Sequence, residues 1–143
     1  VKGKAPPYSP HRHDAHVGDN IGIQVIDTKN NKTLFYSPGL GEPTAETINL
    51  MSQSDCLLVD GTFWEEGEMS KVGLGDKKAA DMGHLPQSGE SGMIELLRPM
   101  QKPRKVLIHI NNTNPILDED SIERKTLNDE KIEVAFDGMD LEL

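Results

Sequence analysis

The sequence predicts an α/β fold, in which helices pack on a sheet, and two observations lead to this class. Short continuous apolar runs occupy 55–60 and 105–110, and such runs are typical of strands buried on both faces of a parallel sheet. Segments with helical signals lie between the predicted strands, and this alternation favours a layered architecture. The 143 residues are enough for one domain with a hydrophobic core.

The first half of the chain is predicted to contain a hairpin, a helix, a strand and a long loop. Alternating apolar residues predict a strand over 21–26, and an Asn- and Asp-rich turn joins it to a strand over 33–37. A helix is expected over 44–52, where Ile48 and Met51 share one face. After the strand 55–60, the glycine-rich and acidic segment 61–78 is expected to form a long loop.

The second half is predicted to end in another hairpin. Ser91 is expected to cap a helix that Pro99 ends. The strand 105–110 and a polar loop follow, and then a helix over 118–127 with early acidic residues and a late Lys125, as the helix dipole favours. Two alternating segments, 132–136 and 139–143, flank Asp137-Gly138, and this pattern predicts a type I′ hairpin.

The composition excludes several classes of protein. There are 24 acidic and 15 basic residues, a net charge of −9, which argues against a nucleic-acid partner because phosphate binding needs clustered cations. No apolar stretch is long enough for a membrane span, and the first ten residues lack the apolar core of a signal peptide. The single cysteine, Cys56, is expected to be a buried thiol in a cytoplasmic protein. Because the opening is proline-rich and lacks an initiating methionine, we expect a chain cut from a longer protein.

Three histidines, His11, His13 and His16, lie close together near the start of the chain. Imidazole is the commonest metal ligand in proteins, and the neighbouring Asp14 is suited to orient one of the rings. These residues therefore predict either part of a metal site or a solvated loop without a metal.

Three further residues are candidates for chemistry at the rim of the predicted sheet. Asp60 ends one buried strand, and His109 lies near the end of another. The carboxyl ends of parallel strands share one rim, where ligands gather in open α/β sheets. His84 lies in a Gly-His-Leu-Pro turn at the end of the long loop. The alternative for each residue is a purely structural hydrogen bond.

The roles of the polar and aromatic residues beside these candidates stay open. Asn111 and Asn112 follow His109 directly, and their amides are suited to a carboxylate-rich ligand or to holding the loop in shape. Trp64 follows Asp60 closely, and its ring is suited to walling an aromatic substrate or to anchoring the loop.

Four motifs carry a resemblance to a known family. In order and spacing, residues 1–143 resemble the C-terminal half of the B proteins of pyrroloquinoline quinone (PQQ) biosynthesis, which are metallo-β-lactamase-like. The resemblance implies half of a single metallo-β-lactamase-like αββα sandwich, with the N-terminal half absent. The motifs are Ala5-Pro6-Pro7-Tyr8-Ser9-Pro10-His11-Arg12-His13, Leu58-Val59-Asp60-Gly61-Thr62-Phe63-Trp64, Met82-Gly83-His84-Leu85-Pro86-Gln87-Ser88-Gly89 and His109-Ile110-Asn111-Asn112-Thr113-Asn114-Pro115.

The resemblance also implies roles for individual residues. His16 and His109 look like metal ligands, while His84 and Asp60 look like acid/base or substrate-orienting groups. The residues expected to bind substrate are Arg12, His11, His13, Asn111, Asn112 and Trp64.

One position departs from the pattern of the wider superfamily. A metal-bridging aspartate is usual there at the end of the hairpin, where this chain has Ser37 and Pro38. Because a bridging carboxylate holds two metal ions together in hydrolytic sites, its replacement favours a mononuclear site. A ligand set of histidines and carboxylates suits a divalent metal, with iron(II) favoured and zinc as the second choice.

The resemblance implies a function in PQQ biosynthesis. The first hypothesis is an iron- and oxygen-dependent oxygenase that hydroxylates the tyrosine ring of a glutamate–tyrosine-derived precursor. The second is a carrier that moves PQQ or its precursor towards the periplasm, and the third is a metal-dependent hydrolase. The expected partner is the small-molecule precursor, and a homodimer is a further expectation.

Overall fold

The computed structural model describes residues 1, 3–6, 8–11 and 13–143. Arg12, one of the predicted substrate-binding residues, lies outside the described residues. The predicted first hairpin is formed by β1 (Ile23–Ile26) and β2 (Thr33–Ser37), which pair antiparallel. Asp27 and Asn31 shape its turn, since the Asp27 amide donates to the Lys32 carbonyl and Asn31 adopts a left-handed backbone with φ 58°.

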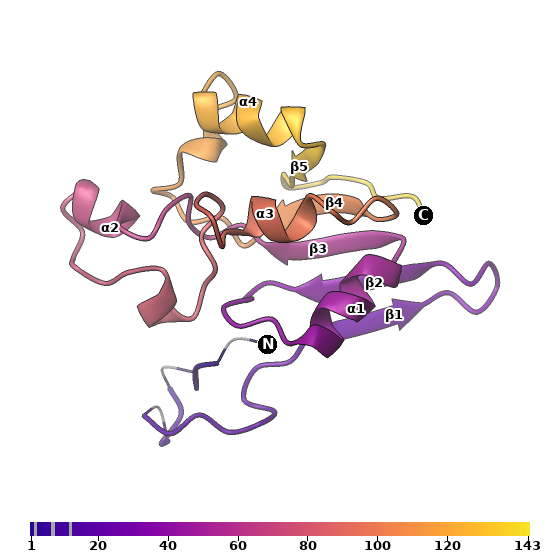
Figure 1. Ribbon diagram of the computed structural model, residues 1–143, viewed down its shortest axis with the longest axis horizontal. Helices are drawn as coiled ribbons and strands as arrows, with labels where there is room; N and C mark the ends of the chain where they lie inside the picture. The colour runs from indigo at the N-terminus through magenta and orange to yellow at the C-terminus, as the bar shows by residue number, and fades with distance from the viewer. Residues whose placement is uncertain (2, 7, 12) are drawn as a thin grey trace.

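The two buried-type apolar runs form the middle of a five-stranded sheet with the order β1-β2-β3-β4-β5. The strands β3 (Cys56–Asp60), β4 (Arg104–Ile108) and β5 (Ile132–Val134) all run parallel to β2 (Figure 1). The predicted α/β class is therefore confirmed.

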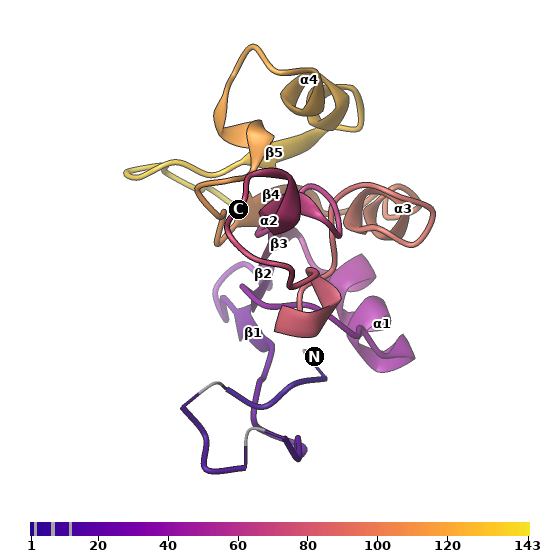
Figure 2. The same cartoon turned by 90° about the vertical axis from the view of Figure 1, so that its left-hand side faces the viewer.

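The helices that connect the parallel strands lie on one face of this sheet. They are α1 (Ala45–Gln53), α3 (Met93–Leu97) and α4 (Ile122–Asp129). Because the strand order never reverses, crossovers of one hand place their helices on the same side, and Figure 2 shows α1 and α3 beside one another on that side. Among the described residues, no helix is long and apolar enough to cross a membrane.

The hydrophobic core lies between this face of the sheet and the helices. Phe35, Leu57, Val59 and Leu107 contribute from the strands. The other fully buried side chains of the core include Met51, Met93, Leu97 and Leu127, from the three helices.

The opposite face of the sheet is apolar, and at β1 and β2 it is open to solvent. The strand register places Ile23, Val25 and Tyr36 on this face, and their side chains are 46%, 51% and 37% exposed. No helix of the described residues covers them. One helical layer on one sheet is the arrangement expected for half of an αββα sandwich, in which a second sheet packs on the open face.

Short helices interrupt the connections. The long loop predicted after β3 contains α2 (Glu68–Lys71) and the 3₁₀ turn η1 (Ala80–Met82). A second 3₁₀ turn, η2 (Pro115–Leu117), follows β4. The loop prediction missed these elements because four residues or fewer are too short to produce a helical periodicity.

Two predicted helix starts differ from the structure. The cap expected from Ser91 is wrong, because α3 begins after Gly92, which makes no side-chain capping bond. The helix expected from residue 118 begins at Ile122, since η2 leaves Asp118 extended and Ser121 supplies the cap by accepting from the Arg124 amide.

The predicted C-terminal hairpin is wrong. β5 pairs only with β4, in parallel, and 135–143 contain no strand. A turn does form, with the Met139 amide donating to the Phe136 carbonyl at 3.1 Å. A type I′ turn needs positive φ at both central residues, and here Gly138 has it (φ 85°) but Asp137 does not. The chain therefore leaves the sheet instead of folding back on it.

Candidate metal and proton-transfer site

The carboxyl ends of β3 and β4 meet at one rim of the sheet, as predicted, and they bring Asp60 and His109 together. His84 reaches the same place from the long loop, directly after the η1 turn. One possible ligand atom from each of these three residues lies within 4.8 Å of the other two. In Figure 1 this rim is the left-hand end of the sheet, where the α2 loop and the N-terminal segment also lie.

Asp60 is completely buried, and four donors satisfy its carboxylate. Oδ2 accepts from the Leu40 amide at 2.9 Å and from His84 Nδ1 at 2.7 Å. Oδ1 accepts from the Thr62 amide at 3.0 Å and from Thr62 Oγ1 at 2.5 Å. A buried charge needs such partners to offset its lost hydration. Because every donor is already in place, the carboxylate is suited to orienting its neighbours.

The sequence Asp60-Gly61-Thr62 allows this geometry through its glycine. A Cβ at Gly61 would lie only 3.0 Å from the Ile108 carbonyl and from Leu107 Cβ. The Gly61 amide donates to the same carbonyl at 2.7 Å. A larger residue would therefore crowd the point where the end of β3 approaches β4, and its neighbours would have to shift by a few tenths of an ångström.

His84 is held in one tautomer by Asp60. The carboxylate can only accept, so the hydrogen-bond network assigns the proton of the neutral ring to Nδ1, and the lone pair lies on Nε2. His84 as a whole is 6% exposed, and its ring packs edge-on against Phe63, with 5.8 Å between centroids. A carboxylate-backed imidazole of this kind is suited both to proton transfer and to metal binding.

His109 ends β4 with a left-handed backbone, φ 58°. The strand was predicted to continue to residue 110, but this conformation ends it at Ile108. Its Nδ1 lies 2.8 Å from Thr62 Oγ1, and its ring stacks on that of His84 at 5.3 Å between centroids, 16° from parallel. A left-handed histidine is strained, and such strain is commonly retained at functional sites.

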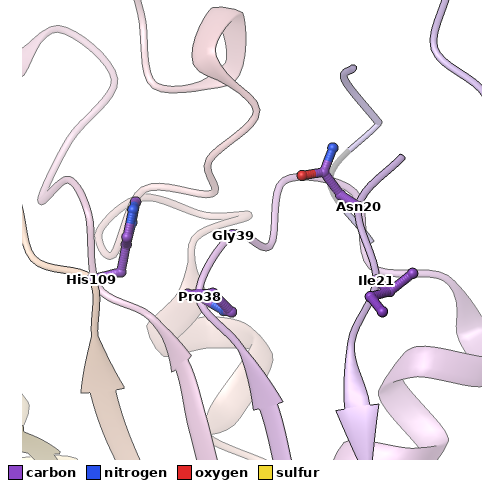
Figure 3. Close-up of a pocket in the computed structure, with 5 residues that line it drawn as sticks. All are labelled: Asn20, Ile21, Pro38, Gly39 and His109. Atoms are coloured by element: carbon purple, nitrogen blue, oxygen red, sulfur yellow. The ribbon is translucent and has the colours of Figure 1, made fainter. Parts of the chain in front are cut away.

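A pocket of about 200 Å³ opens beside His109. Figure 3 shows the imidazole beside Pro38 and Gly39, with Asn20 and Ile21 across the opening. Pro38 thus lies at the position where a bridging aspartate was expected in hydrolytic relatives, and it offers no ligand atom to a metal ion.

The N-terminal histidines lie apart from this group. His16 Nε2 is 3.4 Å from Asp14 Oδ2, the pairing suggested by the sequence, and its side chain is 55% exposed. The ring of His11 meets the ring of His16 edge-on at 5.6 Å, and His13 is exposed. The group formed by Asp60, His84 and His109 does not include His16.

The asparagine loop after His109 is tied to the long loop. Asn111 Nδ2 donates to Thr113 Oγ1 at 2.6 Å and contacts Met69 Sδ at 3.5 Å. Asn114 is buried, and its Nδ2 donates to the Gly61 carbonyl at 2.9 Å. These contacts favour the scaffolding alternative for Asn111, whereas the exposed Asn112 makes none of them.

Glu68 joins the same two loops and was missed in the sequence. It is only 4% exposed, and its Oε2 accepts from the Trp64 amide at 2.6 Å. Its Oε1 accepts from Thr113 Oγ1. The Trp64 ring packs partly buried against the core, which favours its role as an anchor of the loop. Glu68 lies in the short helix α2, for which the sequence carries no periodic signal.

Thr62 and Gln87 are the other site residues that sequence reasoning missed. The Thr62 hydroxyl contacts both histidines and Asp60. Gln87 is fully buried and donates from Nε2 to the Asp60 carbonyl at 2.9 Å. The signal for Thr62 was its place directly after Asp60-Gly61, but nothing local in the sequence indicates hydrogen bonds to residues 22 and 47 positions away.

A family model described as a β-lactamase superfamily domain matches residues 1–110. Two of the similar curated proteins are named coenzyme PQQ synthesis protein B. The one from Nitrosococcus oceani is 58% identical over 99% of this chain and 46% of its own length. The one from Methylococcus capsulatus is 58% identical over the whole chain and 47% of its own length. The chain therefore spans about half the length of the curated relatives that it matches.

A solved structure, described as Zn²⁺-bound PqqB from Methylobacterium extorquens, is similar in fold and sequence. It superposes with a TM-score of 0.81 at 38% identity, over 85% of this chain and 43% of the other.

Proposed function

The chain belongs to the β-lactamase superfamily domain family, and from this premise we propose that the whole protein carrying it takes part in the biosynthesis of coenzyme PQQ. The observation that supports this proposal is the group of Asp60, His84 and His109 at the carboxyl rim, in a chain whose similar proteins are named for PQQ synthesis. We propose further that the whole protein is a metal-dependent enzyme that hydroxylates the tyrosine ring of a glutamate–tyrosine-derived precursor.

The donor set at the rim fits a divalent metal. Two imidazoles and a carboxylate offer ligand atoms within 4.8 Å of one another, and such ligands suit both iron(II) and zinc. His109 is the proposed ligand from this rim, because it is exposed beside the pocket while its Nδ1 is held by Thr62. His16 is the second proposed ligand, from the N-terminal segment. Iron(II) is the proposed metal, and bound there it would supply oxygen activation.

The proposed proton-transfer group is His84. Asp60 accepts from Nδ1, so the opposite nitrogen, Nε2, is the atom at which a proton would be taken up or released. Asp60 keeps this tautomer and stabilises the imidazolium when it forms. Of the other predicted residues, the exposed His11, His13 and Asn112 are proposed to line the substrate site, and Arg12 is proposed with them, whereas Trp64 and Asn111 are proposed to hold the loops beside it.

In the proposed reaction, one atom of molecular oxygen forms the new ring hydroxyl and the other leaves as water, while a reductant supplies two electrons and two protons. The test incubates the whole protein with iron(II), ascorbate as the reductant and the precursor under oxygen, and follows the mass of the precursor. A gain of one oxygen atom is expected. A matched precursor with phenylalanine in place of tyrosine is expected to stay unchanged. An unchanged tyrosine precursor would overturn the hydroxylation proposal.

Pro38 argues against the alternative of a two-metal hydrolase. It lines the pocket beside His109, and a proline offers no ligand with which to bridge a second ion. If two metal ions were found bound per chain, that result would favour the hydrolase alternative. Tight binding of PQQ or its precursor without turnover would instead favour the carrier. We also propose a cytoplasmic protein, which agrees with a single cysteine, Cys56, that is free and buried.

A further inference from the structure

The hydroxyl of Thr62 lies at the centre of the candidate site. Its Oγ1 is 2.5 Å from Asp60 Oδ1, 2.8 Å from His109 Nδ1, 3.0 Å from His84 Nδ1 and 3.0 Å from the His109 carbonyl oxygen. Thr62 is 6% exposed, so these contacts form away from bulk water. One hydroxyl therefore joins residues that come from β3, from the long loop and from the end of β4.

The Thr62 hydroxyl has only one proton to donate in these contacts. A hydroxyl donates once and accepts at two lone pairs, whereas a carboxylate and a carbonyl only accept. The contact with Asp60 Oδ1, at 2.5 Å, has the length of a charge-assisted O–H···O⁻ bond, while the contact with the His109 carbonyl is longer at 3.0 Å. The proton therefore goes to Asp60.

The hydrogen bond from the Thr62 hydroxyl to Asp60 decides which ring nitrogen of His109 carries hydrogen. Its Nδ1 lies 2.8 Å from an oxygen that presents a lone pair, so Nδ1 must carry the hydrogen. Asp60 Oδ2 fixes His84 in the same way through Nδ1. Both stacked rings then carry their lone pair on Nε2.

We propose that Thr62 is a positioning residue that sets the tautomer of His109 and couples its ring to the Asp60–His84 pair. The consequence for metal affinity depends on the proposed function, whereas the tautomer itself follows from the hydrogen bonds alone. When a group that orients a metal-binding histidine in this way is removed, metal affinity commonly falls about 10- to 100-fold.

The backbone of Thr62 explains why this hydroxyl stays in place. Its amide donates to Asp60 Oδ1 at 3.0 Å, and its carbonyl accepts from the Asn111 amide at 3.1 Å. The β-branched side chain also has few rotamers. Serine keeps the hydroxyl with more rotational freedom, and valine keeps the shape without the hydroxyl.

The test uses the whole protein, stripped of metal and labelled with ¹⁵N at its histidines, and NMR reads which ring nitrogen of each neutral imidazole carries hydrogen. Wild type and Thr62→Ser are expected to show Nδ1–H for both His84 and His109. Thr62→Val is expected to lose the Nδ1–H preference of His109 and to keep that of His84, which Asp60 still holds. Thr126→Val, which removes a helical threonine hydroxyl, is the matched control and is expected to change neither ring.

Two results would overturn the proposal, namely Nε2–H at His109 in the wild type, or an unchanged His109 tautomer in Thr62→Val. The wild-type spectrum decides the tautomer even if the valine variant does not fold. Zinc titration gives the second readout, with binding expected to weaken about 10- to 100-fold in Thr62→Val and to stay near wild type in Thr62→Ser. Because the tautomer readout uses neither the PQQ precursor nor a metal, it stays interpretable even if the proposed function fails.

Discussion

Asp60 and His84 form a buried pair, with Oδ2 of the carboxylate 2.7 Å from Nδ1 of the imidazole. Their side chains are 0% and 7% exposed. The two residues lie 24 positions apart in the sequence, and the long loop between them brings His84 back to the strand end at which Asp60 lies. This pair supports the proposal that His84 transfers protons at Nε2.

Replacing Asp60 by asparagine is expected to abolish most of the activity while the fold remains. The NH₂ group of asparagine would take the place of one carboxylate oxygen. It would then face at least one of the four donors that now bond to the carboxylate. The preferred tautomer of His84 would then be lost. The same substitution in a Ser-His-Asp triad lowers the rate about 10⁴-fold, and we expect a loss of about 10²- to 10⁴-fold. Rates of precursor oxidation measure it, with the exposed Asp129→Asn as the control. A rate within about twofold of the wild-type rate would contradict the role of this pair.

His109→Gly is expected to be more stable than His109→Ala. The backbone at this position has φ 58°, which costs an alanine about 1 kcal/mol and a glycine almost nothing. The midpoints of thermal or urea unfolding measure the difference. Both variants are expected to lose the imidazole function equally, so that stability and activity separate. Equal stability of the two variants would mean that the left-handed conformation is not maintained in solution.

Glu68→Ala is expected to release the long loop, whereas Glu68→Gln is expected to hold it. Alanine removes the acceptor of the Trp64 amide and the partner of the Thr113 hydroxyl, and each unpaired buried group costs about 1–3 kcal/mol. Glutamine still accepts at one oxygen, and the Thr113 hydroxyl can turn to accept from its amide. Limited proteolysis within 65–78 measures the release. Equal cleavage rates in the two variants would show that Glu68 does not hold the loop.

The pair Arg104–Glu133 is expected to contribute a pH-dependent part of the stability. The Arg104 guanidinium, which donates to the carboxylate at 2.7 and 2.8 Å, lowers the pKa of Glu133 below its ordinary 4.5. A lowered folded-state pKa means that the contribution is complete above the unfolded value and is lost as the pH falls through the folded value. Glu133→Gln is therefore expected to lower stability near about pH 7 but not near about pH 2.

Urea unfolding at the two pH values measures this difference, with the exposed Glu119→Gln as the control. The same loss of stability at both pH values would exclude the ion pair as its cause.

The sequence predicted the parts of the structure that depend on local patterns. Apolar runs located β3 and β4, and parallel pairing then placed Asp60 and His109 at one rim. The role of Thr62 could not be predicted, because its partners lie 22 and 47 residues away. The C-terminal hairpin was predicted from Asp137-Gly138 but does not form, since a type I′ turn needs positive φ at both central residues and Asp137 does not adopt it.

The central claim is a metal site to which His109 contributes, and metal analysis of the whole protein tests it most directly. Wild type and the variants His109→Ala, His84→Ala and His16→Ala are purified with iron(II), and the bound metal is counted per chain, with Asp129→Asn as the control. We predict about one ion per chain, lost in His109→Ala and in His16→Ala and retained in His84→Ala and the control. The account would be contradicted by metal that stays bound at the wild-type level in His109→Ala.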